Sequence, residues 1–170
     1  KIKIINNIKA KTISFYLNKI NWLDLYKIEP KFIHGDLQFD NIIFNKNKFT
    51  LIDWREKFGN SINFGDLYYD LGKLYGGMHI NYDYIKKNKM FFQINNNKII
   101  FSIKTRKIMD SYLRLFENYI TSKKLDLDKI KLLMPIIFLN MSPLHTQPFN
   151  HILFSYSKLL LKEFFDKNDK

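Results

Sequence analysis

Cysteine is absent from this chain of 170 residues. Neither a disulfide framework nor a thiolate metal site can therefore form, and the absence fits the reducing cytoplasm, where we expect the protein to work. Glycine is scarce as well, since only six occur. No Gly/Ser-rich linker and no internal repeat divides the chain, so its length suits one domain.

Long apolar runs are also missing, although 46% of the residues are hydrophobic, which is enough for a real core. The longest run, Leu132–Leu139, is far shorter than the roughly 20 residues that a membrane-spanning helix needs. The chain does not open with the charged and then apolar pattern of a signal peptide. We therefore expect no membrane span.

Acidic residues are outnumbered, because 16 Asp and Glu face 28 Lys and Arg, which gives a formal net charge of +12. A basic chain of this kind can bind nucleic acid or an anionic membrane surface. Nearly all of the positive charge is lysine, however, and it is scattered instead of gathered in a block with aromatic residues. We interpret it as solvated surface and expect no nucleic-acid partner, while an attraction to ATP or another anionic ligand stays open.

The most informative stretch is Phe32–Trp54, which reads FIHGDLQFDNIIFNKNKFTLIDW. Two short apolar runs, Asn41–Phe44 and Phe49–Ile52, flank a polar connection of four residues and predict a β-hairpin. Because a hairpin brings its outer ends together, Asn41 and Asp53 should lie side by side, with the loop that carries Asp36 next to them.

These residue types suit phosphoryl transfer, which is mostly positioning and charge neutralisation. One carboxylate, Asp36, would orient an acceptor hydroxyl and take its proton. Asn41 and Asp53 would hold Mg²⁺, a cation that prefers oxygen ligands and usually has only one or two protein carboxylates. Taken singly, each residue has a plainer interpretation: Asp36 as a turn residue, Asn41 as the end of a turn and Asp53 as a helix cap.

The same residues resemble a known family. His34-Gly35-Asp36 followed by Asn41, and then Ile52-Asp53-Trp54, match the catalytic loop and metal-binding segment of the aminoglycoside phosphotransferase and choline kinase superfamily. The segment Gly65–Gly72 is similar to the Gly-Asp-x-x-x-Asp-Leu-Ala segment of that family, with Gly72 in place of Ala. A narrower resemblance is to the branch found with bacterial capsule and surface-polysaccharide genes.

The resemblance implies an α+β, mainly α protein: the C-terminal lobe of a protein-kinase-like fold, with short β-hairpins at the catalytic loop. The lobe would span residues 1–170, with the catalytic and metal-binding segment at 32–55 and a helical remainder at 66–167. ATP and Mg²⁺ would be the cofactors, and His34 and Asp70 would brace the loop. Because residue 1 is Lys and no glycine precedes Gly35, we expect the nucleotide-gripping N-terminal lobe to lie upstream in the full product.

Periodicity predicts the other elements. Residues 8–27 should be helical with a break at Asn21, and 54–65 a loop. A helix over 66–79, capped by Asp66, should end near Gly76-Gly77. Further elements are a short helical turn over 82–88, a hairpin formed by Met90–Ile94 and Lys98–Ile103, and three helices. We expect buried faces that include Met109, Tyr112, Phe116 and Tyr119 in the first helix, a break or kink at Pro135 in the second, and Pro148 as the first residue of the third.

The phosphate acceptor is a small molecule in the resembled family, such as an aminoglycoside, choline, ethanolamine or a small sugar. Arg55 would steer an anionic substrate or form a surface ion pair with Glu56 or Asp66. Two other functions stay open, a kinase-like module that binds without catalysis and a protein kinase. The residues that we predict to contact the acceptor, each with a packing or surface role as the plainer alternative, are Trp54, Arg55, His79, Tyr82, Glu117 and His145.

Overall fold

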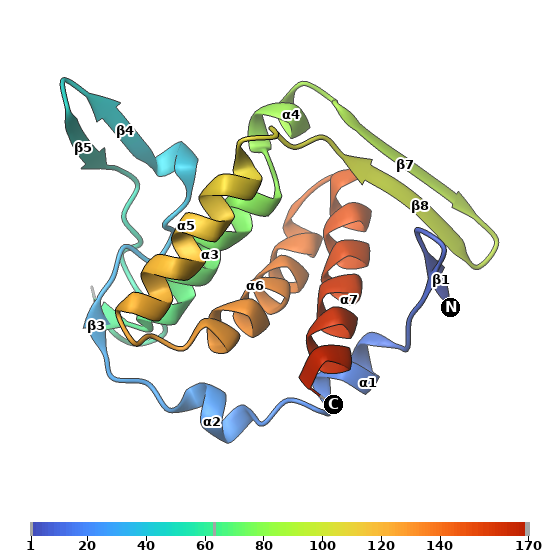
Figure 1. The fold of residues 1–170 in the computed structure, drawn as a ribbon, viewed down its shortest axis with the longest axis horizontal. Coiled ribbons are helices and arrows are strands. Elements are labelled where there is room, and N and C mark those ends of the chain that lie inside the picture. Colours follow the sequence, from blue (N-terminus) through green and yellow to red (C-terminus); the bar gives the residue numbers. More distant parts are fainter. Residues whose placement is uncertain (1, 63, 169–170) are drawn as a thin grey trace.

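The computed structural model describes residues 2–62 and 64–168. It is an α+β fold in which about half of the described residues are helical and the sheets are small (Figure 1). The helices are α1 (Ile13–Leu17), α2 (Trp22–Tyr26), η1 (Phe39–Asn41), α3 (Leu67–His79), α4 (Tyr82–Lys86), α5 (Met109–Ser122), α6 (Leu127–Met141), η2 (Ser142–Leu144) and α7 (Phe149–Asn168). The strands are β1 (Ile4–Ile5), β2 (Ile8–Lys9), β3 (Lys31–Phe32), β4 (Ile42–Asn45), β5 (Lys48–Leu51), β6 (Phe64–Gly65), β7 (Met90–Asn95) and β8 (Lys98–Ile103).

The core lies among helices α3, α5, α6 and α7, which Figure 1 shows gathered in one bundle. A second apolar cluster joins α1 and α2 to α7, through Tyr16 and Leu25 against Leu161 and Phe165. Among the described residues, no helix is long and apolar enough to cross a membrane. The side chains at the centre of the bundle are Tyr75, Met78, Ile80, Phe116, Ile120, Ile130, Met134, Phe138, Phe149 and Leu153.

The largest sheet has the strand order β2-β1-β8-β7, in which β1 runs parallel to β8. Strands β7 and β8 form the predicted hairpin, whose register pairs Met90 with Ile103. One face of this sheet is buried, because Ile5 and Ile99 pack against Ile152 of α7. The long hairpin is thereby fixed to the helix bundle.

The hairpin of β4 and β5 confirms the predicted pairing of the two apolar runs, although its connection is shorter than expected. Asn45 pairs with Lys48, so only Lys46 and Asn47 form the turn. Both have positive φ angles, 44° and 61°, as tight two-residue hairpin turns require. Figure 1 shows this hairpin projecting away from the helix bundle.

The prediction of a helical region over residues 8–27 is wrong for its first residues, and its predicted break at Asn21 is confirmed. Residues Ile8–Lys9 form strand β2, which pairs with β1 across a turn at Asn6 and Asn7. Helix α1 begins only after Thr12, whose side chain accepts a hydrogen bond from the N–H of Phe15. Asn21 separates the two helices because it caps α2 in the same way, accepting from Asp24.

Helix α3 begins as predicted, with the side chain of Asp66 accepting a hydrogen bond from the N–H of Tyr68. It ends at His79, which confirms the predicted range 66–79, and it continues through Gly76-Gly77, where the glycines had suggested an end. Gly76 serves close packing instead, because a Cβ atom there would lie 2.8 Å from the ring of Phe138 on α6. The absence of a side chain lets the two helices approach each other.

Three details of the last three helices bear on the expectations. Tyr112 and Tyr119 of α5 are exposed, because only Phe116 and Ile120 of the predicted stripe face the core fully. Helix α6 runs through Pro135 as one element, so no new helix begins there. Helix α7 begins at Phe149, one position after the predicted start at Pro148.

We predict opposite effects for two alanine substitutions in α3. Gly76→Ala should lower the free energy of unfolding by about 1–2 kcal/mol, because the new methyl meets a buried ring that cannot move away easily. Gly72→Ala should be neutral or stabilising, since its Cβ meets the mobile tip of Ile137 at 3.1 Å and alanine favours helix. Urea unfolding followed by circular dichroism measures both, and equal losses would contradict the assigned role of Gly76.

Candidate active site

The loop that follows β3 carries the predicted catalytic residues and is attached to the start of α3. Strand β3 pairs antiparallel with β6, which brings Lys31 opposite Gly65. Because Gly65 immediately precedes the capped start of α3, this small sheet holds the loop next to the first turn of that helix. This loop, residues 33–41, carries the predicted base and is called the catalytic loop below. It lies against the start of α3.

Asp70 fixes the backbone of the loop. Its carboxylate accepts a hydrogen bond from the N–H of His34 at 2.6 Å and from the N–H of Gly35 at 2.9 Å. Burial raises the pKa of Asp70, and hydrogen bonds from the N–H groups of His34, Gly35 and Leu37 oppose that rise. A buried carboxylate needs such partners, and the arrangement is the one that the family resemblance implies.

His34 connects the loop to the end of β5. Its Nδ1 accepts a hydrogen bond from the N–H of Asp36 at 3.2 Å, so Nε2 carries the proton and donates to the carbonyl of Ile52 at 2.8 Å. Its ring also lies 4.8 Å from that of Trp54. His34 therefore ties the predicted base to the strand that precedes the predicted metal ligand.

Gly35 allows the catalytic loop to approach the segment around Arg55 closely. Its φ angle is +79°, a conformation that side chains disfavour, and a Cβ atom there would lie 2.6 Å from the Cβ of Arg55. The N–H of Arg55 donates to the carbonyl of His34 at 2.9 Å. Position 35 thus brings the loop and the chain after Asp53 into direct contact.

Asp36 and Asn41 lie together. The side-chain nitrogen of Asn41 donates to the carbonyl of Asp36 at 2.9 Å and lies 3.3 Å from a carboxylate oxygen of the same residue. Since the nitrogen of the buried amide faces Asp36, the amide oxygen is the atom with which Asn41 would contact a cation. The carbonyl of Asn41 also accepts from the N–H of Ile52 at 3.0 Å.

Asp53 is exposed and has a φ angle of 56°. Its neighbours on both sides are bonded to the catalytic loop, Ile52 to Asn41 and His34, and Arg55 to His34. These bonds fix the backbone on either side of Asp53 to the loop that carries Asp36 and Asn41. Within residues 2–62 and 64–168, no group of three or more His, Cys, Asp and Glu side chains has a metal-binding arrangement. The predicted metal ligands are one amide and one carboxylate, Asn41 and Asp53, a set that suits Mg²⁺ when the phosphates of a nucleotide supply further ligands.

Lys73 is the residue that the motif-based prediction missed. Its ammonium lies 2.6 Å from a carboxylate oxygen of Asp36, and its side chain is only 8% exposed. The other carboxylate oxygen of Asp36 accepts from the side chain of Gln38 at 3.2 Å. The sequence offered one signal, since Lys73 follows Asp70 by three residues and so lies on the same face of the helix.

Two residues predicted to contact the acceptor lie beside the loop but are occupied by packing. Trp54 packs on His34 and Phe32, and its indole N–H donates to the carbonyl of Leu51. The guanidinium of Arg55 lies 5.5 Å from the ring centre of Tyr69, so it stacks on an aromatic ring. The structure gives Arg55 this cation–π contact in the place of the expected ion pair.

Tyr82 and His145 lie close enough to the predicted base and Lys73 to interact with their charges. Burial, with the negative charges of Asp36 and Asp40, raises the pKa of Tyr82. Burial, with the positive charge of Lys73, lowers the pKa of His145. Tyr82 lines a small hollow of about 230 Å³ together with Phe39, Asp40, Gly77, Ile80, Asn81, Asp83, Arg106 and Met109.

His79 and Glu117 line a different cavity, of about 480 Å³, whose lining includes no residue of the catalytic loop. Glu117 accepts a hydrogen bond from the hydroxyl of Tyr75 at 2.6 Å and pairs with Lys131 at 2.9 Å. The Nδ1 atom of His79 lies 3.1 Å from the hydroxyl of Tyr156. The structure does not bring these two residues together with Asp36, so the candidate site does not include them.

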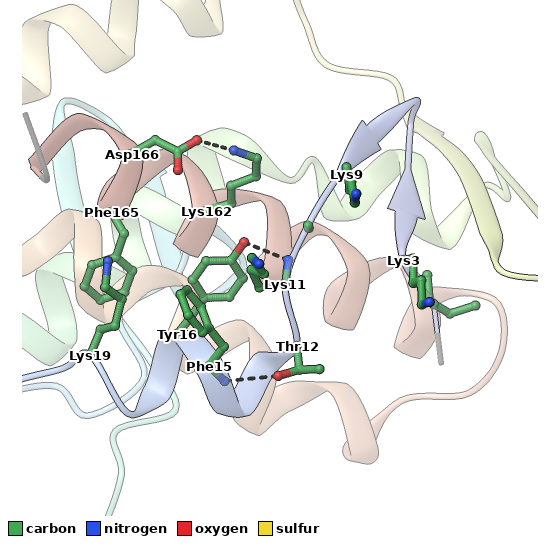
Figure 2. Close-up of a pocket in the computed structure, with 12 residues that line it drawn as sticks. Lys3, Lys9, Lys11, Thr12, Phe15, Tyr16, Lys19, Lys162, Phe165 and Asp166 are labelled. Atoms are coloured by element: carbon green, nitrogen blue, oxygen red, sulfur yellow. Dashed lines mark hydrogen bonds and ion pairs between the residues drawn. The ribbon is translucent and has the colours of Figure 1, made fainter.

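A further hollow, of about 590 Å³, is lined by residues outside the predicted catalytic motif (Figure 2). Residues 2–19 and 162–166 contribute its walls, which include five lysines and one carboxylate, Asp166, bonded to Lys162. None of the catalytic-loop residues lines it. Its size alone therefore does not make it the candidate active site.

The loop lies in a stretch of the chain that is similar to a known protein family. Residues 17–87 match the model of the phosphotransferase enzyme family, APH. No curated protein and no solved structure matches the chain. The family match implies a kinase-like fold for that stretch, while the narrower capsule-associated resemblance and the assignment to a C-terminal lobe stay predictions. The matched residues include the whole loop and its contacts on α3: His34, Asp36, Asn41, Asp53, Asp70 and Lys73.

Removing the carboxylate of Asp70 should loosen the loop. Asp70→Ala leaves two buried N–H groups without their partner, so we expect a loss of about 2–4 kcal/mol in the free energy of unfolding. Hydrogen exchange should show that the amides of His34 and Gly35 lose protection. Asp66→Ala, which removes only a helix cap, should cost about 1 kcal/mol and leave those two amides protected.

His79 should make the fold sensitive to acid. Burial lowers its pKa from 6.5 to about 4, so between these values the unfolded chain binds a proton that the folded chain does not. Stability should therefore fall by about 3 kcal/mol as the pH drops through that window. His79→Gln should remove this slope in urea unfolding at several pH values. The exposed histidine variant His151→Gln should keep it, and an unchanged slope in His79→Gln would refute the assignment.

Proposed function

We propose that this protein is an ATP-dependent phosphotransferase that moves the γ-phosphate to a hydroxyl group of a small molecule. The observation that carries the proposal is the hydrogen-bonded contact between Asp36 and Asn41, together with the backbone bonds of Ile52 and Arg55, which join the segment around Asp53 to the same loop. It lies within the stretch that matches the phosphotransferase family. Positioning and electrostatics of this kind are the main requirements of phosphoryl transfer.

Asn41 and Asp53 would hold Mg²⁺ through the amide oxygen and the carboxylate. The donor set fits the metal, because Mg²⁺ takes oxygen ligands and is usually bound by one or two carboxylates and the phosphates of the nucleotide. When bound, the ion neutralises charge on the transferring phosphoryl group.

Asp36 would act as the base. Its side chain is 29% exposed, so an acceptor can reach it, yet hydrogen bonds and an ion pair fix its position. In this role it accepts a hydrogen bond from the acceptor hydroxyl and takes the proton as the oxygen attacks phosphorus. His34 and Asp70 would hold the backbone of the loop and contribute no proton of their own.

The acceptor is proposed as a sugar, an amino-alcohol such as choline, or an aminoglycoside-like compound. The narrower resemblance favours a precursor of a surface polysaccharide. Of the residues first predicted to contact it, Tyr82 has the strongest support, because it lies within reach of the charge of Asp36. Trp54 and Arg55 would border the same edge.

The proposal is tested by following the labelled γ-phosphate of ATP in the complete gene product with Mg²⁺. The acceptors are choline, ethanolamine, glycerol, simple sugars and aminoglycosides. Asp36→Asn should lower transfer by about 10²–10⁴-fold, the usual contribution of a general base. Asp53→Asn should abolish the dependence of nucleotide binding on Mg²⁺.

The control is Asp110→Asn, an exposed carboxylate of α5 that should leave transfer unchanged. Nucleotide binding that ignores both Mg²⁺ and Asp53→Asn, without transfer, would favour a non-catalytic binding module. Transfer to generic protein acceptors alone would favour a protein kinase. A folded protein with neither nucleotide binding nor transfer would refute the proposal.

A further inference from the structure

Lys73 gives helix α3 a second contact with the catalytic loop. Asp70 holds the backbone of the loop, and Lys73, three residues later on the same face, holds the side chain of Asp36. The ammonium lies 2.6 Å from the carboxylate. One helix therefore sets both the path of the loop and the direction of its base.

The ion pair is unusual because its lysine is buried while its carboxylate is partly open. Only 8% of the Lys73 side chain is exposed, against 29% of that of Asp36. A buried ammonium is costly without a partner, and the other contact of Lys73, the sulfur of Met141 at 3.8 Å, is a weak acceptor. The lysine thus depends on the one carboxylate that an acceptor must also reach.

Apart from Asp53, which would hold Mg²⁺, the carboxylates Asp36, Asp40 and Asp83 are paired with basic side chains and leave little to attract a cationic acceptor. Asp40 pairs with Lys86 at 2.7 Å, and Asp83 pairs with Arg106 at 3.5 Å. Asp36 itself is neutralised by Lys73. A positively charged acceptor bound at Asp36 would lie within a few bond lengths of the ammonium and would be repelled by it.

We infer that Lys73 is a positioning residue for Asp36 and that its charge selects neutral or anionic hydroxyl compounds, such as sugars and uronic acids, over amines. This inference rests on the proposed function. The carboxylate keeps one oxygen on Lys73 and presents the other, which Gln38 and Asn41 approach, to the acceptor. During transfer the proton of the acceptor hydroxyl passes to this carboxylate, the oxygen–phosphorus bond forms and ADP leaves.

The positioning role is tested with Lys73→Met and Lys73→Arg. Lys73→Met should lower kcat by about 10–100-fold through misplacement of the base, while the KM for ATP changes by less than about twofold. Lys73→Arg should recover part of the loss, because it restores the charge. Lys131→Met, which breaks another partly buried ion pair of the bundle, the one with Glu117, should leave kcat unchanged.

The selection of acceptor is tested with glucose, glucosamine and glucuronate, which share most of their hydroxyl groups and differ in charge. At a pH where glucosamine is protonated, its kcat/KM should be at least about tenfold below those of the other two. In Lys73→Met this difference should shrink. A wild-type preference for glucosamine, or an order that Lys73→Met leaves unchanged, would overturn the inference about charge.

The pair itself is tested without turnover by a double-mutant cycle in urea unfolding. Lys73→Met and Asp36→Asn together should shift the midpoint by less than the sum of the single shifts. Additive shifts would overturn the positioning role. If transfer depends on Asp36 but Lys73→Met keeps the wild-type kcat, this inference fails alone. If Asp36→Asn leaves transfer intact, or no acceptor is phosphorylated, the proposed function fails as well.

Discussion

The carboxylate of Asp70 is the contact on which the rest of the site depends. It is buried, and it accepts hydrogen bonds from the backbone of His34 and Gly35 at the point where the loop turns. Several other contacts of the site start from His34 or from Asp36, two positions further along the chain. His34 reaches the end of β5, and Asn41 reaches Asp36. The carboxylate of Asp70 on α3 therefore fixes the backbone of the loop to the helix bundle.

The hairpin and the catalytic loop could be predicted because short-range patterns determine them. The apolar runs predicted the strands β4 and β5. The hairpin also predicted that its outer ends lie together, as the bond from Ile52 to Asn41 shows. The two-residue turn was missed because Asn45 and Lys48 are polar strand residues on an exposed hairpin. A hydrophobic pattern carries no information about such positions.

The remaining errors concern contacts between segments far apart in the chain. Gly76 suggested the end of a helix from its residue type. In the structure it lies inside α3, where the lack of a side chain leaves room for the ring of Phe138 on α6. His79 and Glu117 looked like acceptor contacts, but the packing of α3, α5 and α7 turns them towards a separate cavity. Lys73 was given no role from the sequence, and only the fold shows that it meets Asp36.

The bonds of Asp70 also determine when the site exists during folding. They join residues 36 and 35 positions apart, so the loop cannot be fixed until α3 has formed and returned to it. Opening of the first turn of α3 would break both of these hydrogen bonds and release the loop, even if the rest of the helix stayed packed. The position of the predicted base is therefore coupled to the stability of one helical turn.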